Sequence, residues 1–249
     1  MPGLRVEREG GVLRLTLQRP ERRNAFDAAL VGELADSFRG AGDARAVVLA
    51  GEGPSFSAGA DIDEMRGAID RSREQNLADA HGWRLLLEAV ERCETPVVAA
   101  VHGNALGGAC GILACCDVVV AERGATFGFS EVKLGLVPAV ISPFVVARIG
   151  AGAARALFVT GERFDADRAL RIGLVTEVTD DLAGALGRVV GELLAAGPRA
   201  AKIAKRIARA PLPAAETERL IAELRTTDEA QEGLSAFLDR RAPEWRQSG

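Results

Sequence analysis

Apolar residues are grouped along this chain into short runs that suit strands, separated by longer stretches with helical spacing. The strand-like segments are one alternating run and four mainly apolar runs, at residues 12–17, 46–50, 96–101, 117–121 and 174–178. Residues 27–38 and 78–92 repeat apolar positions at helical spacing. One stripe of the second helix carries Trp83, Leu86, Leu87 and Val90. Strands that alternate with helices predict an α/β fold.

After about Leu182 the pattern becomes helical throughout. Its three stretches are interrupted by Gly-Pro and Pro-Leu-Pro sequences, which end helices, and they cover residues 182–196, 198–208 and 214–237. We therefore expect a core domain at residues 1–181 and a C-terminal helical region at residues 182–249. The second stretch contains a basic run, residues 199–206, which suits either a solvated helix face or the binding of ligand phosphates.

Composition and charge narrow the classes of protein. With 249 residues, 48% of them hydrophobic, the chain can bury a substantial core. The formal net charge of −4 gives no general attraction to nucleic acid or to an anionic membrane. The first residues lack a signal-peptide run, and no apolar stretch approaches the roughly 20 residues of a membrane span. A cytoplasmic protein without nucleic-acid or membrane partners is expected.

The cysteines and histidines give no sign of a metal or redox site. Cys93, Cys110, Cys115 and Cys116 have no C-x-x-C spacing, and no cluster of histidines accompanies them. Unpaired cysteines are among the residues most often buried in proteins. We expect these four to be small apolar core residues, and no metal ion is predicted.

Two glycine-rich turns are the strongest sign of chemistry. The first glycine turn, Ser55–Asp61, and the second, Gly103–Gly111, each follow an apolar strand. Small residues let a ligand touch the backbone itself. Two backbone N–H groups that converge from such turns form an oxyanion hole, which holds a carbonyl oxygen as it becomes negative. The pair predicts an enzyme that acts on an acyl group.

Glu131 is the candidate acid–base residue. It lies among apolar residues in the segment 126–138, where loss of solvation would raise its pKa and suit it to accept and return a proton near neutral pH. A glutamate exposed at the start of a helix would explain the same position. The segment alone leaves both interpretations open.

Together these segments resemble the enoyl-CoA hydratase/isomerase (crotonase) family. The resemblance begins at Arg19-Pro20-Glu21-Arg22-Arg23-Asn24-Ala25-Phe26, similar to the family's R-P-x-x-x-N-A segment. It continues through both glycine turns and Glu131 to Gly173-Leu174-Val175 and the C-terminal residues 232–245. A single glycine turn would be weak evidence, whereas this ordered set extends over nearly the whole chain.

The resemblance implies a crotonase-type spiral of repeated β-β-α units and a C-terminal helical region that packs between subunits of a homotrimer or dimer of trimers. It implies an acyl-CoA thioester as substrate and no separate cofactor, because coenzyme A is part of that substrate. It assigns the backbone N–H groups of Ala60 and Gly108 to the thioester oxygen and Glu131 to proton transfer. It assigns contacts with the substrate and its coenzyme A to Arg23, Ala25, Ala58, Asp61, Ile62, Gly107 and Gly111.

The chain departs from the family pattern at Gly111. Typical hydratases have a first catalytic glutamate at the position that Gly111 occupies here, so Glu131 would act alone. A single carboxylate can add water to a 2-enoyl-CoA, or it can shuttle a proton between C2 and C4 as a Δ3,Δ2-enoyl-CoA isomerase does. The segment 131–144 is similar to bacterial methylglutaconyl-CoA and isohexenylglutaconyl-CoA hydratases, which favours hydration but does not define the acyl chain.

Two other classes of function are considered. A serine hydrolase would use Ser130 in Gly128-Phe129-Ser130-Glu131-Val132, but Val132 replaces the last glycine of the motif, and both His81 and His102 precede the serine. A catalytically degenerate acyl-CoA-binding protein would explain Gly111. Both glycine turns and Glu131 argue against it, because a binder needs no acid in its acyl pocket.

Overall fold

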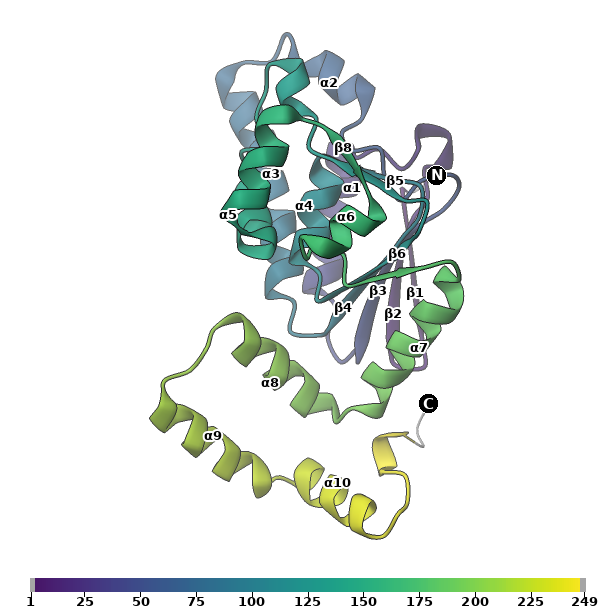
Figure 1. Cartoon of the computed structure of the whole chain (residues 1–249), viewed down its shortest axis with the longest axis vertical. Coiled ribbons are helices and arrows are strands. Elements are labelled where there is room, and N and C mark those ends of the chain that lie inside the picture. The colour runs from purple at the N-terminus through teal and green to yellow at the C-terminus, as the bar shows by residue number, and fades with distance from the viewer. Residues whose placement is uncertain (1–2, 247–249) are drawn as a thin grey trace.

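The computed structural model describes residues 3–246, in which a twisted sheet forms the centre of the core (Figure 1). Its strands lie in the order β1-β2-β3-β4-β6-β9. Their bounds are Leu4–Glu9, Val12–Leu17, Ala46–Gly51, Val97–Val101, Val118–Glu122 and Glu177–Thr179. β1 is antiparallel to β2 and the other neighbours are parallel. The α/β prediction is confirmed.

A second, smaller sheet lies beside the first. Its strands, in the order β5-β7-β8, are Asn104–Leu106, Thr126–Gly128 and Arg163–Asp165. The chain passes from β4 to β5 and then to helix α4 (Gly108–Cys115), and it repeats that path with β6, β7 and helix α5 (Ser142–Thr160). Each repeat therefore contributes a strand to each sheet and then a helix. This is the β-β-α spiral that the resemblance implies.

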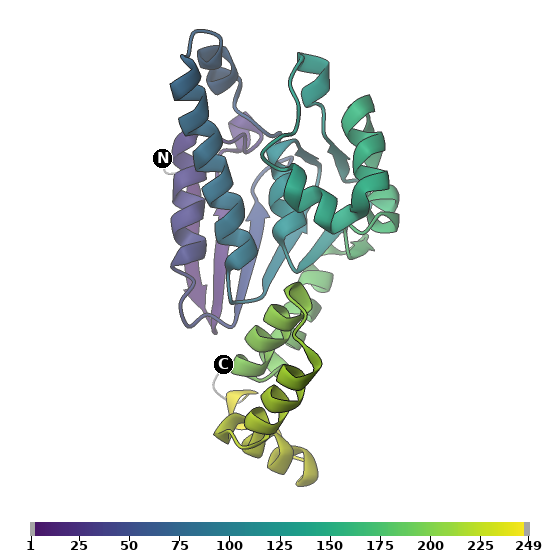
Figure 2. The ribbon, with the colours of Figure 1, turned by 90° about the vertical axis from the view of Figure 1, so that its left-hand side faces the viewer.

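Helices cover both faces of the larger sheet. The main core lies between the sheet and α1 (Ala28–Arg39), α3 (Arg73–Arg92), α4 and α5 (Figure 2). Helix α7 (Leu182–Ala195) packs on the opposite face, where Ala185 and Val190 contact apolar side chains of β2, β3, β4 and β6. Strands covered on both faces are expected to be apolar runs, which explains why the sequence pattern predicts β3, β4 and β6.

Two helix boundaries differ from the predicted ones. α3 begins at Arg73 instead of residue 78, because Ser72 and Gln75 form a capping box ahead of the apolar stripe. The predicted stretch 214–237 divides into α9 (Ala214–Arg225) and α10 (Asp228–Leu238). Thr227 caps α10 by accepting the N–H of Ala230 at 3.3 Å. Polar capping residues, which apolar periodicity does not detect, set both boundaries.

Short elements complete the described part of the chain. They are α2 (Ile62–Ala68), α6 (Ala166–Arg171) and the 3-10 segments η1 (Pro20–Arg22), η2 (Glu131–Leu134) and η3 (Glu244–Arg246). The predicted strand 174–178 is present only as β9, since Leu174 and Val175 pack into the core before the strand begins. Edge strand β1 was not predicted, because Leu4 is its only buried residue.

Helix α5 is long and apolar enough to cross a membrane by length and composition. Gly150, with φ of 76° and ψ of 155°, interrupts its helical backbone and divides it into two shorter parts. Val145, Ile149, Ala154 and Leu157 are buried in the main core. These contacts identify α5 as a helix of the folded core.

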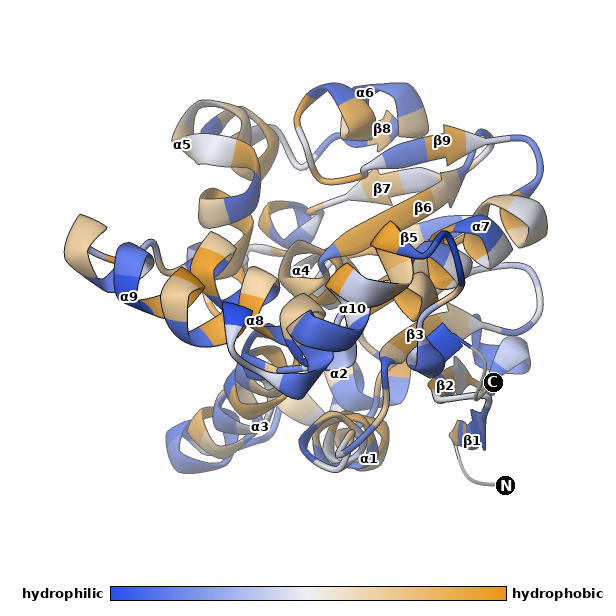
Figure 3. Cartoon of the chain, turned by 90° about the horizontal axis from the view of Figure 1, so that it is seen from below, coloured by the Kyte–Doolittle hydropathy of each residue, from blue (hydrophilic) through white to orange (hydrophobic). Residues whose placement is uncertain are grey.

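Helices α8 (Pro198–Arg209), α9 and α10 project away from the sheets (Figures 1 and 2). Apolar segments alternate with hydrophilic ones along α8 and α9 (Figure 3). Because α7 lies on the sheet, only the helices after it form this projecting part. The division at residues 181 and 182 stays a prediction, and residues 1–2 and 247–249 of the two predicted regions lie outside the described residues.

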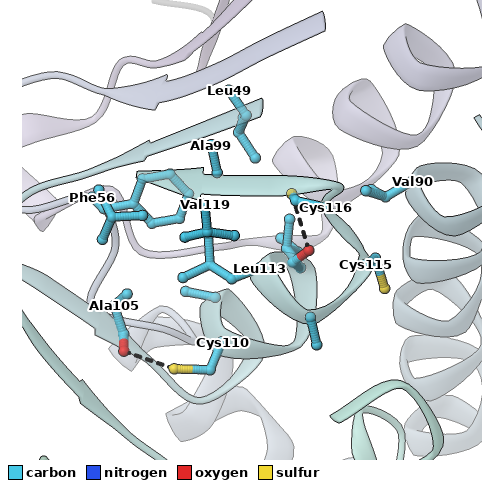
Figure 4. Packing of buried hydrophobic residues seen from close by; sticks show 14 of the residues in the cluster. Leu49, Phe56, Val90, Ala99, Ala105, Cys110, Leu113, Cys115, Cys116 and Val119 are labelled. Carbon is cyan, nitrogen blue, oxygen red and sulfur yellow. Dashed lines mark hydrogen bonds between the residues drawn. The ribbon is translucent and has the colours of Figure 1, made fainter. Parts of the chain in front are cut away.

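The four cysteines are buried, as predicted. Each is at most 6% exposed, and none is in a disulfide. Cys110 Sγ donates to the carbonyl oxygen of Ala105 at 2.9 Å, and Cys116 Sγ donates to that of Ile112 at 3.3 Å (Figure 4). Burial raises the pKa of the Cys110 thiol to about 12, so this thiol stays protonated and unreactive near neutral pH.

The basic run in α8 attaches this helix to the core. Lys205 Nζ lies 2.7 Å from Asp117 Oδ2 and donates to the carbonyl oxygen of Thr95 at 3.1 Å. Its side chain is only 6% exposed. Asp117 Oδ2 also accepts the N–H of Val97 at 2.7 Å. Lys205 therefore joins α8 to the ends of β4 and β6, and this lysine contributes to neither of the two predicted roles of the basic run.

We expect Lys205→Ala to lower the free energy of unfolding by about 2 kcal/mol, because it leaves a partly buried carboxylate without its cation. Lys202→Ala is the matched control, since Lys202 Nζ makes one exposed bond to the carbonyl oxygen of Gly42, and its effect should stay within about 0.5 kcal/mol. Urea unfolding at fixed protein concentration measures both. Equal effects of the two substitutions would contradict this role of Lys205.

Candidate active site

The first glycine turn is held by a buried asparagine from an earlier loop. Asn24 is fully buried and has a left-handed backbone, with φ of 54°. Its Nδ2 donates to the carbonyl oxygens of Glu52 and Ser55 at 2.8 Å each. Its Oδ1 accepts the N–H of Arg19 at 2.8 Å. Loss of any of these hydrogen bonds would leave a buried polar group unpaired, which costs free energy. Asn24 therefore fixes the first glycine turn relative to the loop before α1.

The N–H of Ala60 is left free by the pairing around it. Phe26 donates its N–H to Gly59 and accepts that of Asp61, at 2.8 Å and 2.9 Å. In this parallel bridge the N–H of Ala60 points to the opposite side. Within residues 3–246 it has no hydrogen-bond partner. It is therefore available to a ligand, and Ala60 lines a pocket of about 680 Å³.

Asp61 acts within the protein. Its side chain is 3% exposed, and its carboxylate lies 2.9 Å from Arg19 Nη2 and 3.3 Å from Arg22 Nη1. Asp61 Oδ1 also caps α2 by accepting the N–H of Asp63 at 2.9 Å. The carboxylate thus fixes the residue next to Ala60 and the start of α2 together, and it does not face the pocket.

The other predicted contact residues of this region surround the first glycine turn. Arg23 is exposed, and its carbonyl oxygen accepts the N–H of Ala58 at 2.9 Å. Ala25 is 6% exposed and packs in the core. Ile62 begins α2 and is 69% exposed. The structure brings these four residues to one end of the sheet, with the side chains of Arg23 and Ile62 in solvent.

The second glycine turn leads directly into α4. Gly107 has φ of 54° and ψ of −119°, and its N–H donates to the carbonyl oxygen of Gly128 at 2.8 Å. Gly108 is the first residue of α4, so its N–H lacks an intrahelical partner. No other described residue accepts it. The N–H groups of Gly108 and Ala60 are the two that the family resemblance assigns to an oxyanion hole.

Trp83 lies against Gly108. A Cβ atom at Gly108 would be 2.7 Å from Trp83 Cζ3 and closer still to Cη2, so only glycine fits here without moving the indole. The indole packs edge-on against Phe26, with ring centroids 5.2 Å apart, and both rings line the same pocket as Ala60. The sequence places Trp83 on the buried stripe of its helix, but no spacing signal predicts its contact with the second glycine turn.

Glu131 lies at the start of η2, directly beside the second glycine turn. Its Oε1 is 3.2 Å from where a Cβ atom of Gly107 would be. Its Oε2 is buried and has no hydrogen-bond partner in the described part of the chain. Burial raises the pKa of this carboxyl. The interpretation of Glu131 as an exposed helix-start residue is therefore wrong, and the site holds an acid with a free oxygen.

Gly111 is buried in α4, where the resemblance expects the first catalytic glutamate. The space for a side chain is already occupied, since a Cβ atom would be 2.8 Å from Ile141 Cβ and closer to its Cγ2. Leu87 Cδ2 would be at an ordinary contact distance of 3.5 Å. The position is thus not an open gap beside Glu131. No sequence signal predicts that Ile141, which is thirty positions further along, fills it.

The pocket beside Ala60 is mostly apolar. Its walls come from α1, α2, α3 and the loop after η2, and they include Phe26, Val31, Met65, Ile69, Trp83 and Leu134. Arg71 is at its edge and forms ion pairs with Glu64 and Asp79. This cation is therefore already neutralised by acidic neighbours. The pocket suits an uncharged chain.

Neither histidine forms part of a catalytic triad. His81 is exposed on α3. His102 Nε2 lies 2.8 Å from the carbonyl oxygen of Gly53. No hydrogen bond joins Ser130 to either ring among the residues that the structure describes. The serine-hydrolase interpretation has no support in the geometry.

Comparison with known proteins shows the family. A family model described as enoyl-CoA hydratase/isomerase matches residues 7–248. A short-chain-enoyl-CoA hydratase of Clostridium acetobutylicum is 32% identical, over 95% of this chain and 94% of that protein. A 2,3-dehydroadipyl-CoA hydratase of Escherichia coli is 33% identical, over 99% of each. The crystal structure of an enoyl-CoA hydratase from Shewanella pealeana has a TM-score of 0.91 and 36% identity, covering 98% of this chain and 96% of that one.

The chain belongs to the enoyl-CoA hydratase/isomerase family. The family is enzymatic, and the relatives named above are hydro-lyases by their names. The protein is therefore an enzyme with a crotonase fold, and the expectation of a catalytic protein is confirmed.

We expect Glu131→Gln to raise the melting temperature at pH 7.5 but to leave it nearly unchanged at pH 4. The raised pKa means that the buried carboxylate destabilises the fold when ionised, and this cost disappears below the ordinary glutamate pKa of about 4.3. Glu122→Gln, at an exposed glutamate, is the control. Thermal unfolding at the two pH values measures the difference. A shift of equal size at both would show that Glu131 is not destabilised by its charge.

Proposed function

We propose that the protein adds water across the C2–C3 double bond of a 2-enoyl-CoA. The observation that carries this proposal is the buried Oε2 of Glu131, which has no partner among the described residues and lies beside the Gly107–Gly108 turn. This oxygen atom is left for a ligand or for water. The names of the relatives support hydration of an enoyl-CoA.

The thioester oxygen binds to the N–H groups of Ala60 and Gly108. Addition of hydroxide at C3 moves negative charge onto that oxygen, and fixed donors stabilise the charge without having to reorient. Loss of one such donor costs about 10²–10³ in kcat in other enzymes. The Asn24 and Asp61 contacts keep the donor of the first glycine turn in place, and α4 keeps the other.

Glu131 carries the proton. As a carboxylate it takes a proton from water while the water oxygen bonds to C3, which leaves an enolate thioester and a neutral carboxyl group. The carboxyl then returns the proton to C2, and the carboxylate is restored. Burial raises the pKa of this carboxyl group, which makes the carboxylate a stronger base toward water than an exposed glutamate would be.

The coenzyme A part of the substrate extends from the thioester past α2. The supporting features are the exposed apolar side chains of α2 and its C-cap: Met65 and Ile69 line the pocket, and Ile62 begins the helix. Arg23, Ala25 and Ala58 are adjacent on the first glycine turn and its supporting loop. Coenzyme A belongs to the substrate, and the reaction requires no separate cofactor.

The identity of the substrate's acyl chain is inferred from the sequence and from the residues that line the pocket. A methylglutaconyl type of substrate follows from the resemblance of residues 131–144, and its carboxylate would need a cation. Arg71 is the cation at the pocket edge, and it already pairs with Glu64 and Asp79. The apolar walls favour a chain without that carboxylate, so both kinds of substrate belong in the assay.

Isomerisation is the second candidate activity. The buried contact between Gly111 and Ile141 leaves Glu131 as the only carboxyl assigned to proton transfer, and one carboxyl can move a proton between C2 and C4. The same site would then convert a 3-enoyl-CoA into a 2-enoyl-CoA. The two activities differ in the substrate that is consumed.

We expect the purified protein to hydrate crotonyl-CoA or 3-methylglutaconyl-CoA faster than it isomerises a 3-enoyl-CoA. Glu131→Gln should lower kcat by about 10²–10⁴ while a saturated acyl-CoA still binds, because the amide keeps the size but carries no transferable proton. Glu122→Gln should keep wild-type turnover. Binding without turnover of any of the three substrates would indicate a degenerate acyl-CoA-binding protein, and near-wild-type turnover of Glu131→Gln would show that another group carries the proton.

We further propose a homotrimer or a dimer of trimers. The supporting observation is the apolar surface on the projecting helices, where Ile221, Leu234, Phe237 and Leu238 are 49–80% exposed. Exposed apolar surface of this kind is typical of subunit interfaces. Light scattering at micromolar concentration should give three or six chain masses. A monomer would contradict the assembly.

A further inference from the structure

Gly111 and Ile141 form a packed contact between α4 and the start of α5. Both residues are buried, and Ile141 is 5% exposed. The isoleucine lies so close that a Cβ atom on Gly111 would be 2.8 Å from its Cβ, a separation at which something must shift. The next nearest atom, Leu87 Cδ2, would be at an ordinary 3.5 Å. The overlap that a side chain at position 111 would make is therefore with Ile141.

The space that Ile141 fills is next to the proton carrier. Gly111 donates its N–H to the carbonyl oxygen of Gly107 at 3.3 Å, so the two glycines lie one above the other, about 6 Å apart along the helix. Glu131 Oε1 lies beside Gly107, 3.2 Å from where a Cβ atom of Gly107 would be. Side chains on a helix tilt toward its N-terminus. A side chain at position 111 would therefore point toward the Glu131 carboxyl group.

Ile141 also ends the loop that carries Glu131. At the start of this loop the carbonyl oxygen of Glu131 accepts the N–H of Leu136 at 3.1 Å. At its end Val145 donates its N–H to the carbonyl oxygen of Ile141 at 3.0 Å, which begins α5. The loop is thus held on α4 at both ends, by Glu131 near Gly107 and by Ile141 on Gly111.

We propose that Ile141 is a positioning residue with two effects. It fills the space that a carboxyl group at position 111 would occupy, and it holds the loop that carries Glu131 at the correct distance from α4. Gly111 and Ile141 fit only as a pair. Exchange of both residues would open the place to a second carboxyl group, whereas exchange of Gly111 alone would not. The proposal rests on the proposed function of Glu131 for its catalytic part, and its packing part stands without it.

Thermal unfolding tests the packing part. Gly111→Ala should lower the melting temperature by roughly 2–10 °C, because the added methyl group overlaps Ile141. In the Ile141→Gly background the same substitution should cost nothing, since the overlapping side chain is gone. An equal cost of Gly111→Ala in both backgrounds would overturn the pairing. This result does not depend on any enzymatic activity.

Kinetics tests the positioning part. Ile141→Gly should lower kcat at least tenfold with little change in KM, because a displacement of about 1 Å at a proton carrier costs up to 10²-fold in rate. Ile141→Val keeps the Cβ and a methyl group against Gly111, and it should restore turnover to within about threefold of the wild type. A kcat for Ile141→Gly equal to the wild-type value would overturn the positioning role.

The exchanged pair gives the decisive comparison. Gly111→Glu/Ile141→Gly should hydrate crotonyl-CoA at least ten times faster than Gly111→Gln/Ile141→Gly, which has the same size without a charge, and its pH profile should gain a second ionisation. Gly111→Glu alone should melt at a lower temperature than the wild type. Equal rates of the two double variants, or a single variant as stable as the wild type, would overturn the proposal. If the wild-type protein turned over no enoyl-CoA, the proposed function would fail, and the melting temperatures would still decide the pairing.

Discussion

The proposed site depends on two backbone N–H groups, those of Ala60 and Gly108, that the fold holds in place without a protein partner in residues 3–246. A backbone N–H group without a protein partner normally bonds to water or to a neighbouring carbonyl group. Other hydrogen bonds therefore have to hold the backbone around it in place. At Ala60 these bonds come from the parallel bridge to Phe26 and from the buried side chains of Asn24 and Asp61. At Gly108 the start of α4 leaves the donor free by its geometry. Much of the polar interior near the site serves this purpose.

Glu131 adds a third polar group without a partner in the described residues. A buried carboxyl oxygen without a partner costs stability, and the raised pKa expresses that cost. The hydrophobic core offsets it, since Phe127 and Phe129 in the segment before Glu131 are fully buried and residues 109–115 of α4 are buried as well. Within residues 3–246 the fold therefore leaves polar groups at Ala60, Gly108 and Glu131 without a protein partner, and each of them can bond to a ligand or to water.

The sequence predicts the parts of this structure that depend on local pattern. Apolar runs predict β3, β4 and β6 because both faces of these strands are covered, and glycine spacing predicts the two turns. The strands β5, β7 and β8 have three residues each, and they pair only because the spiral brings them together. Such strands have no length over which periodicity can be read. Likewise the contacts of Trp83 with Gly108 and of Ile141 with Gly111 join segments that are far apart in the chain, so no local signal predicts them.

The glycine at position 111 has a physical consequence beyond the loss of a carboxyl group. If the helix carried a glycine there and nothing filled the space, water would enter beside Glu131, and the solvation would lower its pKa toward the ordinary value. Ile141 fills the space at Gly111, and in the proposed arrangement it would exclude that water from Glu131, whose pKa is raised by burial. A single proton carrier has to be both a base toward water and an acid toward C2, and a raised pKa serves both roles. Under the proposed function, the isoleucine that occupies the space at position 111 would thus also provide the environment in which one carboxyl group is sufficient.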